Sequence, residues 1–466
     1  MMTVSEISQA IERYTLALLS SNSPVLSGNQ QPKLVLAYSG GVDSECLAYG
    51  LSLFAQQHPD VPCLLVHVHH GLSDNAETWV EHCLTQAKKY QLPIQIERVN
   101  LTKAPRKSLE AIARDARYNV FKKYLNQGDI LLTAHHQDDQ LETVLLALKR
   151  GQGPKGLAAM GAMQLFNQHS WIVRPLLDVS RSQIESFAAS VELKHIEDES
   201  NQDEQFDRNF LRQDIIPRLK QRWPSIAVTA SRSANLCAQQ QQVIEQEVNN
   251  RLPDFIDSSV KAQFPAFKLL NLREQSYQWQ GLLLRGFIQS QGFNLPSQSQ
   301  LEQIIEQTLN AADDAKVNVH CGDYSIKRFA GNAYIVPVID EVSLKVDQAD
   351  VINTLSGFIS EEPPQAANSL TINEYQIFMV DQGIRLRMPR NESVTIVYGT
   401  KGSTRCQPHF RDKGRELKKI WQELAVPPWQ RNQIPLVFYN DYLVAAIGLW
   451  VDKRFLAQQQ ELGFKL

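Results

Sequence analysis

The feature that most constrains the fold of this chain is the alternation of short apolar runs with helix-forming segments between residues 33 and 177. Patterns typical of buried strands occupy residues 33–39, 62–69, 93–101, 129–135 and 171–177. Helical patterns occupy residues 44–56, 75–90, 108–125 and 138–149. Strands that alternate with helices of about ten or more residues predict parallel βαβ units with helices on both faces of the sheet. We therefore predict an α/β fold with a Rossmann-like parallel sheet, which binds ligands at the carboxyl ends of its strands.

The rest of the chain predicts further domains, because 466 residues exceed what one hydrophobic core usually organises. After residue 217 the strand patterns fade, and helical patterns rich in Gln, Leu and Glu take over and close with short strands. A later stretch concentrates Pro, Ser, Glu and Asn, which is typical of a linker. Beyond it, short strands surround one helix at 414–424. We predict a catalytic domain over 1–217, a mostly helical domain over 218–350, a linker over 351–371 and a small α/β or β-rich domain over 372–466.

Composition and charge exclude several classes of protein. No apolar run approaches the roughly 18 residues that a membrane span requires, and the N-terminal segment lacks the pattern of a signal peptide. We therefore expect a cytoplasmic protein without a membrane partner. The six cysteines lie seventeen or more residues apart, which excludes CxxC pairs, so we expect them to be reduced and mostly buried. With a net charge of −3, any nucleic-acid site must be a local basic patch.

The segment SGGVDS, which follows the first predicted strand, indicates a phosphate-binding loop. Two glycines let backbone amides approach an anion, and the next helix offers its positive N-terminal end. The pattern is neither a Walker A loop nor the GxGxxG fingerprint, and it has no lysine to follow a γ-phosphate. A carboxylate suits an anion-binding site only when a cation lies between the carboxylate and the anion. We therefore assign Asp43 to Mg²⁺ binding and to catalysis. A glycine-rich turn without a ligand is the alternative. The candidate ATP-binding residues are Ser39, Gly40, Gly41, Val42, Asp43 and Ser44, with His70 at the end of the second strand.

A second group of ionisable residues follows the fourth predicted strand, in HHQDDQLET. Glu142 lies three or four positions after each of two aspartates, so it shares a helix face with both. This group falls on the same sheet edge as the glycine loop, where ligands bind. Stabilising the helix N-terminus is the alternative role for one or two of the acids. The candidate catalytic residues here are His136, Asp139 and Glu142, and Asp138 is a candidate Mg²⁺ ligand.

Two arginines on the third predicted helix, Arg114 and Arg117, lie three residues apart and face roughly one way. We predict that they are catalytic, with a guanidinium aimed at a phosphate group on which charge develops during the reaction. A solvated helix face is the alternative.

These motifs resemble a known family. SGGVDS is similar to the signature of the PP-loop ATP pyrophosphatases, which cleave ATP between the α and β phosphates to adenylate a substrate. RPLLDVSRSQIE at 174–185, the stretch at 196–219 that contains RNFLR, and GRELKK at 414–419 resemble the tRNA(Ile)-lysidine synthetase family, in its form with two C-terminal domains. One departure is Glu199, where we expect proline in EDPSN, and it bears only on the shape of that loop.

The resemblance implies a ligase that uses ATP and Mg²⁺. The wobble cytidine of an isoleucine tRNA with a CAU anticodon is adenylated at its carbon-2 oxygen, and pyrophosphate leaves. The ε-amine of free L-lysine then attacks that carbon and expels AMP, and the product, lysidine, pairs with A, so that AUA is read instead of AUG. Because the lysine amine is protonated at neutral pH, Asp139 and Glu142 are candidates for a base or for an anchor of the ammonium group. The sequence leaves open which does which.

The tRNA contacts that the resemblance implies include Arg208, Asn209 and Arg212 in RNFLR. In addition, residues 401–419 carry seven Lys and Arg against two Asp and Glu, which is the most basic segment of the chain. Such a segment can neutralise a phosphate backbone, and a solvated helix face is the alternative. The candidate residues in this tail are Arg415, Lys418, Lys419 and Arg431.

Two other functions compete with this interpretation. One is another PP-loop adenylating enzyme, such as a tRNA thiolase or a small-molecule amidoligase; thiolases carry catalytic cysteines, and we expect no cysteine near the loop. The other is a tRNA-binding protein with a degenerate loop, which the intact SGGVDS and HHQDD disfavour. A homodimer is left open.

Overall fold

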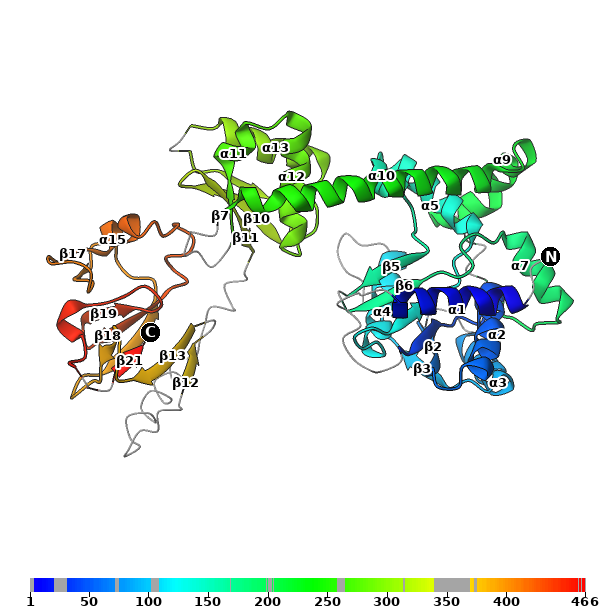
Figure 1. Cartoon of the computed structure of the whole chain (residues 1–466), viewed down its shortest axis with the longest axis horizontal. Coiled ribbons are helices and arrows are strands. Elements are labelled where there is room, and N and C mark those ends of the chain that lie inside the picture. Colours follow the sequence, from blue (N-terminus) through cyan, green and yellow to red (C-terminus); the bar gives the residue numbers. More distant parts are fainter. Residues whose placement is uncertain are drawn as a thin grey trace. The chain divides into compact units, whose positions relative to one another are not determined.

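The computed structural model describes residues 4–20, 32–71, 75–101, 109–167, 169–197, 199, 203, 205–257, 265–312, 315–338, 369–372, 375–459, 461 and 463–465. The chain divides into two compact units, Met1–Glu245 and Gln246–Leu466. Figure 1 shows the helices and strands of both.

The first unit is built on a six-stranded sheet in the order β3-β2-β1-β4-β6-β5. All neighbouring pairs are parallel except β5 and β6, which are antiparallel at one edge. The predicted parallel sheet is therefore confirmed, although the sequence patterns missed the short edge strand β5. The strands are β1 (Leu34–Ala37), β2 (Cys63–His69), β3 (Ile94–Arg98), β4 (Ile130–Leu132), β5 (Met163–Phe166) and β6 (Ser170–Val173).

Helices cover both faces of this sheet, because alternate residues of a strand point to opposite sides. Leu34 and Leu36 of β1 belong to one core, which also holds residues of α1, α2, α3 and α7. Val35 belongs to a second core, with Val120 and Phe121 of α4. The helices are α1 (Val4–Ser20), α2 (Val42–Gln57), α3 (Ala76–Tyr90), α4 (Leu109–Lys123), α5 (Gln137–Lys149), the short α6 (Pro154–Leu157) and α7 (Arg181–Ser190).

Helix α1 is the longest element of this unit that the sequence patterns missed. It packs beside α2 (Figure 1), with Ile7 and Ile11 buried in the larger core. The two helices approach closely at Gly50, where an added Cβ would lie 2.4 Å from Cγ2 of Ile7. The contact depends on tertiary packing, which local periodicity does not encode.

The chain that follows β6 returns to the carboxyl edge of the sheet. Ile196 donates its backbone N–H to the carbonyl of Gly40 at 2.9 Å, so this segment lies directly against the glycine loop. It continues through α8 (Asp207–Phe210), a π-helical turn (Leu211–Ile215), α9 (Ile216–Arg222) and the long α10 (Ile226–Phe255). The boundary between the two units, after Glu245, falls within α10. Single-turn π-helical stretches often occur at functional sites.

The second unit begins at Gln246, so the predicted helical region, which starts at residue 218, belongs to both units. This region closes with short strands, as predicted. Its helices pack on a five-stranded sheet in the order β7-β8-β11-β10-β9, with Phe267, Leu283 and Tyr324 fully buried between them. The helices are α11 (Leu269–Arg273), α12 (Tyr277–Ser290) and α13 (Gln298–Asn310), and the strands are β7 (Ile256–Asp257), β8 (Ala266–Lys268), β9 (Asn318–His320), β10 (Tyr324–Phe329) and β11 (Asn332–Pro337).

The C-terminal region of the second unit is rich in β-strands, as predicted. Two four-stranded sheets, ordered β12-β13-β21-β14 and β15-β18-β19-β20, and the pair β16–β17 accompany the helix α15 (Leu417–Glu423). Residues 351–368 of the predicted linker lie outside the described residues, and 369–371 belong to β12. The strands are β12 (Ser369–Ile372), β13 (Tyr375–Val380), β14 (Leu386–Arg387), β15 (Val394–Tyr398), β16 (Arg405–Cys406), β17 (Arg415–Glu416), β18 (Pro435–Tyr439), β19 (Tyr442–Ala446), β20 (Trp450–Val451) and β21 (Gly463–Lys465).

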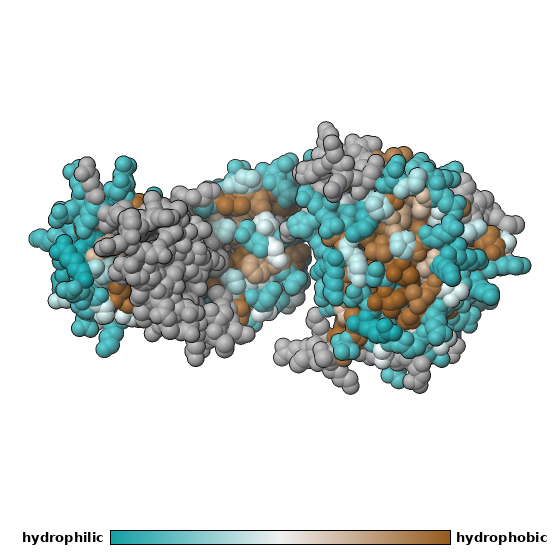
Figure 2. Space-filling view, turned by 90° about the horizontal axis from the view of Figure 1, so that it is seen from below, coloured by the Kyte–Doolittle hydropathy of each residue, from teal (hydrophilic) through white to brown (hydrophobic). Residues whose placement is uncertain are grey.

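Figure 2 shows one face of the molecule, on which hydrophilic residues surround smaller areas of hydrophobic residues. In the described part of the chain, no helix is both long and apolar enough to cross a membrane.

The glycine loop generates the first prediction. Gly40 has a φ of +84°, and an added Cβ would lie 2.4 Å from Cδ1 of Ile196. Gly71 has a φ of +65° but open space around it. Both Gly→Ala variants are strained, but Gly40→Ala also overpacks the loop and should lose about 1–3 kcal/mol more unfolding free energy than Gly71→Ala. Denaturant titration measures both, and equal losses would contradict the close packing at Gly40.

Candidate active site

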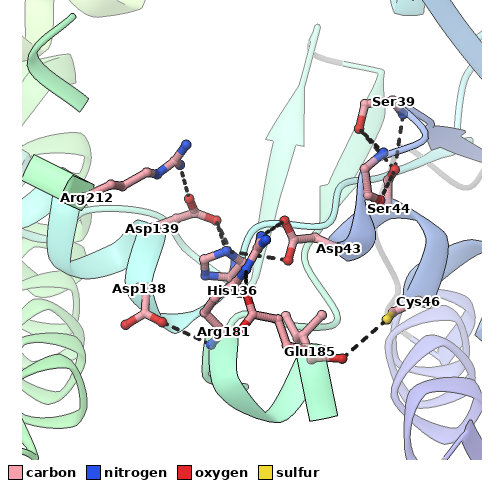
Figure 3. A network of polar contacts seen from close by, with 12 residues as sticks. Ser39, Asp43, Ser44, Cys46, His136, Asp138, Asp139, Arg181, Glu185 and Arg212 are labelled. Atoms are coloured by element: carbon pink, nitrogen blue, oxygen red, sulfur yellow. Dashed lines mark hydrogen bonds and ion pairs between the residues drawn. The ribbon is translucent and has the colours of Figure 1, made fainter. Parts of the chain in front are cut away.

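The glycine loop lies at the carboxyl end of β1 and is held by its two serine hydroxyls. Ser44 Oγ accepts hydrogen bonds from the N–H of Gly40 at 3.0 Å and of Ser39 at 3.3 Å, and it donates to the carbonyl of Gly41 at 3.0 Å. Figure 3 shows Ser39 and Ser44 facing each other, with their hydroxyls 3.0 Å apart. The loop is therefore ordered by its own residues.

The outer side of the loop is suited to an anion. Ser39 is exposed and Gly41 is partly exposed, while Val42, the first residue of α2, is buried. Gly41 is the N-cap of α2 and provides no side chain to cap it. The amides at the start of this 16-residue helix thus face a position where an anion is stabilised by hydrogen bonds and by the helix dipole.

Asp43 connects this loop to His136, which lies between β4 and α5, and to Arg181 of α7. Its Oδ2 pairs with Nη1 of Arg181 at 2.6 Å, and its Oδ1 lies 3.7 Å from Nε2 of His136 (Figure 3). Oδ1 is buried and has no hydrogen-bond partner among the residues that the structure describes. Burial raises the pKa of Asp43, and the charges of His136 and Arg181 only partly offset that rise. This carboxylate therefore has an oxygen available for a cation.

Asp138 opens α5 and is already engaged on both oxygens. Its Oδ2 accepts from the backbone N–H of Arg181 at 3.0 Å, and its Oδ1 pairs with Nζ of Lys220 at 2.5 Å. Asp138 thus joins α5 to α7 and α9. Oδ1 of Asp138, like Oδ1 of Asp43, has no hydrogen-bond partner among the described residues, but the ammonium of Lys220 lies directly against it. Asp138 is therefore a weaker Mg²⁺ candidate than Asp43.

Asp139 and Glu142 share one helix face, as predicted, and both bind Arg212 from the π-helical turn. The guanidinium contacts Oε1 and Oε2 of Glu142 at 2.5 and 3.0 Å and Oδ1 of Asp139 at 2.8 Å. Asp139 Oδ2 also accepts the N–H of His136 at 2.9 Å, which closes the start of the helix. Arg212, which was predicted to contact tRNA, is therefore placed within the carboxylate cluster.

The two carboxyl groups differ in their proton affinity. Burial raises the pKa of Glu142, and Arg212 only partly offsets it. Burial also acts to raise the pKa of Asp139, but the charges of His136, His135 and Arg212 outweigh it, so this pKa is lowered. At neutral pH Asp139 is therefore the more firmly ionised of the pair, and Glu142 the stronger base.

The fit to Mg²⁺ depends on Asp43. In the described ranges, no group of three or more His, Cys, Asp and Glu is arranged to hold a metal. Mg²⁺ is usually bound by one or two carboxylates together with substrate phosphates rather than by a complete protein cage. The uncommitted Oδ1 of Asp43, next to the anion-binding loop, fits that mode.

The predicted His70, Arg117 and Arg114 lie near the same edge. His70 directly follows β2; burial, and then the charge of Arg117, lower its pKa to about 4, so it is neutral at pH 7. Arg114 lies over the ring of Tyr118, 5.0 Å from its centre. The positive charges of Arg114 and Arg208 both reach His135, whose pKa is lowered chiefly by burial.

Asn209 has a more internal role than predicted. It is buried, and its amide donates to the carbonyl of Asp203 at 2.9 Å. This contact shapes the loop before α8. Its predicted contact with tRNA stays a prediction.

The site contains two further residues, Arg181 and Lys220, which the sequence analysis did not identify as site residues. Arg181 lies in RPLLDVSRSQIE, which was singled out only as a family motif, and Lys220 lay in no motif. Each pairs with an aspartate far away in the chain. Spacing in the sequence gives no signal for such pairs.

The expectation of no cysteine near the loop is wrong. The Sγ of Cys83 would lie 3.1 Å from a Cβ on Gly40, and Cys46 follows the loop on α2. Both are fully buried and free, and burial raises the pKa of Cys46 to about 12 and that of Cys83 above its usual range. A thiol in this state is a poor nucleophile. All six cysteines are free, as predicted.

In the C-terminal region, three of the four predicted tRNA-binding residues form one exposed basic group. Arg415 pairs with Glu423 at 3.3 Å, and Lys418 and Lys419 lie 3.3 and 4.0 Å from Glu416. All three basic side chains remain exposed. The fourth residue, Arg431, is half-buried; it donates to the carbonyl of Val426 at 3.1 Å, and burial lowers its pKa.

Comparisons with known proteins match most of the chain. Family models match residues 8–219 as a PP-loop domain, 267–334 as a TilS substrate binding domain and 394–466 as a TilS substrate C-terminal domain. The tRNA(Ile)-lysidine synthase of Shewanella oneidensis is 52% identical over 468 residues, which cover 99% of this chain and 98% of that protein. The tRNA(Ile)-lysidine synthase of Vibrio vulnificus is 38% identical, covering 96% of this chain and 99% of that protein.

Among solved structures, the U34-tRNA thiolase NcsA from Methanococcus maripaludis matches 50% of this chain and 78% of its own. The TM-score is 0.41 and the identity is 19%, a likeness too remote to bear on function.

The Arg212 cluster generates a prediction about pH. Arg212→Ala removes the charge that lowers the pKa of both Asp139 and Glu142. A buried carboxyl with a raised pKa lowers the free energy of unfolding at any pH where the unfolded chain would ionise it. The loss of unfolding free energy in the variant should therefore be small near pH 4.5 and grow toward pH 8. We expect roughly 1–3 kcal/mol at neutral pH, less than for a fully buried pair because the Arg212 side chain is 40% exposed.

The matched control is Arg218→Ala, which breaks an exposed ion pair with Asp214 four residues away. It should cost about 0–1 kcal/mol across the same range. Thermal unfolding of both variants from pH 4.5 to 8 measures this. A deficit of Arg212→Ala that did not depend on pH would contradict the assigned pairing.

Proposed function

The chain belongs to the tRNA(Ile)-lysidine synthase family, and on that premise we propose that it joins L-lysine to carbon 2 of the wobble cytidine in an isoleucine tRNA with a CAU anticodon. The reaction consumes ATP and yields lysidine, AMP and pyrophosphate. The observation that carries the proposal is that Asp43 and His136 bring the SGGVDS loop and the acidic helix α5 into one site.

In the first step the glycine loop binds ATP. The amides of Gly40 and Gly41, the hydroxyls of Ser39 and Ser44, and the start of α2 hold the pyrophosphate part. His70, neutral at pH 7, lies at the end of β2 for a nucleotide contact. Arg114 and Arg117 face the same edge, where a guanidinium offsets the charge that develops on the α-phosphate.

Mg²⁺ would be held by Asp43 together with the phosphates, and when bound it neutralises phosphate charge. Arg181 now pairs with the other oxygen of Asp43. This arginine can keep that contact or turn to a phosphate, which is also a partner that suits a guanidinium. Asp138 remains a structural brace between α5, α7 and α9.

In the second step a neutral lysine amine is required, although its pKa in water is near 10.4. The raised pKa of Glu142 makes it the better proton acceptor, while the lowered pKa of Asp139 keeps it ionised to hold an ammonium group. We assign the base to Glu142 and the anchor to Asp139. Arg212 contacts both carboxylates and keeps them in one orientation.

The tRNA must give up the stacking of its wobble base to reach this site, at a cost of a few kcal/mol. The exposed group of Arg415, Lys418 and Lys419 offsets that cost by neutralising phosphates elsewhere on the tRNA. Arg208 lies close enough to the carboxylates to meet the RNA near the reacting base. We expect the reaction to take place in the cytoplasm.

A tRNA thiolase is the competing function that the loop alone permits. It requires a reactive thiol, and the two cysteines beside the loop are buried with raised pKa values. The dependence of pyrophosphate release on lysine separates the two functions.

Incubation with labelled lysine and ATP tests the proposal directly. Label should enter the isoleucine tRNA with the CAU anticodon, with one pyrophosphate released per lysine, and should not enter the methionine tRNA that shares this anticodon. Labelling of both tRNAs would refute the specificity, and labelling of neither would refute the activity.

Asp43→Asn tests the role of the loop carboxylate. The variant keeps the size of the side chain but loses the charge that holds a cation, so kcat/KM for lysine incorporation should fall by about 100-fold or more. Glu185→Gln is the matched control, because Glu185 pairs with the same Arg181 at 2.7 Å from an exposed position. It should change the rate less than about threefold. Unchanged incorporation in Asp43→Asn would remove Asp43 from the mechanism.

A further inference from the structure

A fully buried carboxylate, Glu45, lies directly behind the glycine loop and has no role in the chemistry proposed above. It belongs to the first turn of α2. Its Oε1 accepts the hydroxyl of Tyr38 and lies 2.9 Å from Nε2 of His82, and its Oε2 accepts the hydroxyl of Tyr90 at 2.8 Å. Three donors, one directly after β1 and two on α3, therefore converge on one carboxylate.

Stability alone does not explain why a carboxylate is buried at this position. Burying a carboxylate loses its hydration, and a well-packed apolar side chain is often at least as stable in its place. Burial raises the pKa of Glu45, and the three hydrogen bonds act to lower it. Burial and the adjacent Glu45 raise the pKa of Tyr38, which keeps its hydroxyl protonated as a donor.

The position of the Tyr38–Glu45 bond distinguishes it from the other two. Tyr38 is the residue immediately before SGGVDS and Glu45 is the residue immediately after it. The hydrogen bond between their side chains therefore closes the loop at its base. We call this bond the clasp.

Both ends of the clasp are fixed to the rest of the sheet. The N–H of Tyr38 donates to the carbonyl of Val66 at 3.0 Å, and its carbonyl lies 3.0 Å from Nδ1 of His67, also on β2. Glu45 is tied to α3 through His82 and Tyr90. Closing the loop thus also fixes it relative to β2 and α3.

We propose that Tyr38 and Glu45 are positioning residues, whose clasp holds the glycine loop in the conformation that binds the phosphates of ATP. This inference rests on the proposed use of ATP. A loop ordered before binding loses less conformational entropy when the ligand arrives, so its affinity is higher. Without the clasp the loop occupies the binding conformation for only a fraction of the time, and the apparent affinity falls by that fraction.

Tyr38→Phe tests the clasp, with Tyr90→Phe as the matched control. Each variant deletes one hydroxyl that Glu45 accepts, and each leaves the carboxylate two other donors, but only Tyr38→Phe opens the bond across the loop. We expect Tyr38→Phe to raise the Kd for ATP with Mg²⁺ by about five- to tenfold, measured by calorimetry. It should raise the KM for ATP in lysine incorporation by a similar factor and leave the KM for lysine unchanged.

Tyr90→Phe should lower the melting temperature comparably but change the Kd for ATP less than about twofold. Glu45→Leu, which removes the acceptor of the bond, should also weaken ATP binding, and adding Tyr38→Phe to it should weaken binding no further, because the bond is already absent.

The outcomes are distinct. Equal loss of ATP affinity in Tyr38→Phe and Tyr90→Phe, or unchanged affinity in Tyr38→Phe, would overturn the clasp and leave the proposed function in place. Losses that add in the double variant would also overturn it. Wild-type protein that failed to bind ATP would instead overturn the proposed function, and the clasp's role in it.

Discussion

Charge balance at the carboxyl edge of the parallel sheet is the constraint on which the rest of the first unit depends. Helices α2 and α5, which follow β1 and β4, bring four carboxyl groups to this edge, and all are largely removed from water. Buried carboxylates require partners, because an uncompensated charge costs several kcal/mol. The partners are Arg181, Arg212 and Lys220, all from the chain that follows β6. The α/β sheet and the segment over 181–220 therefore form one functional piece, and neither completes the site alone.

This balance has a direct chemical consequence. Asp43, Asp139 and Glu142 each face a position where a cation is favoured, and in the chain itself a guanidinium stands there. A metal ion or a substrate ammonium that enters must share or replace that guanidinium. The carboxylates are thus held in place before any substrate arrives, which reduces the reorganisation that catalysis would otherwise require.

How far the sequence predicts this structure depends on the range of the interactions. The strands and helices of the βα alternation were predictable, because apolar runs and glycines act locally. His136, Asp139 and Glu142 could be grouped from the sequence because they are neighbours at the start of α5. Helix α1 was missed because its packing against Gly50 is a tertiary contact. Arg181 and Lys220 were missed because their partners lie far away in the chain, where spacing carries no information.

His136 gives the two halves of the site a common member. It is buried, and its Nε2 lies 3.7 Å from Oδ1 of Asp43 and 3.5 Å from Oδ2 of Asp139. The negative charge of Asp139 acts to raise the pKa of Asp43, so the two carboxyl groups are coupled electrostatically. In the proposed reaction, a cation at Asp43 and an ammonium group at Asp139 would therefore each affect the binding of the other.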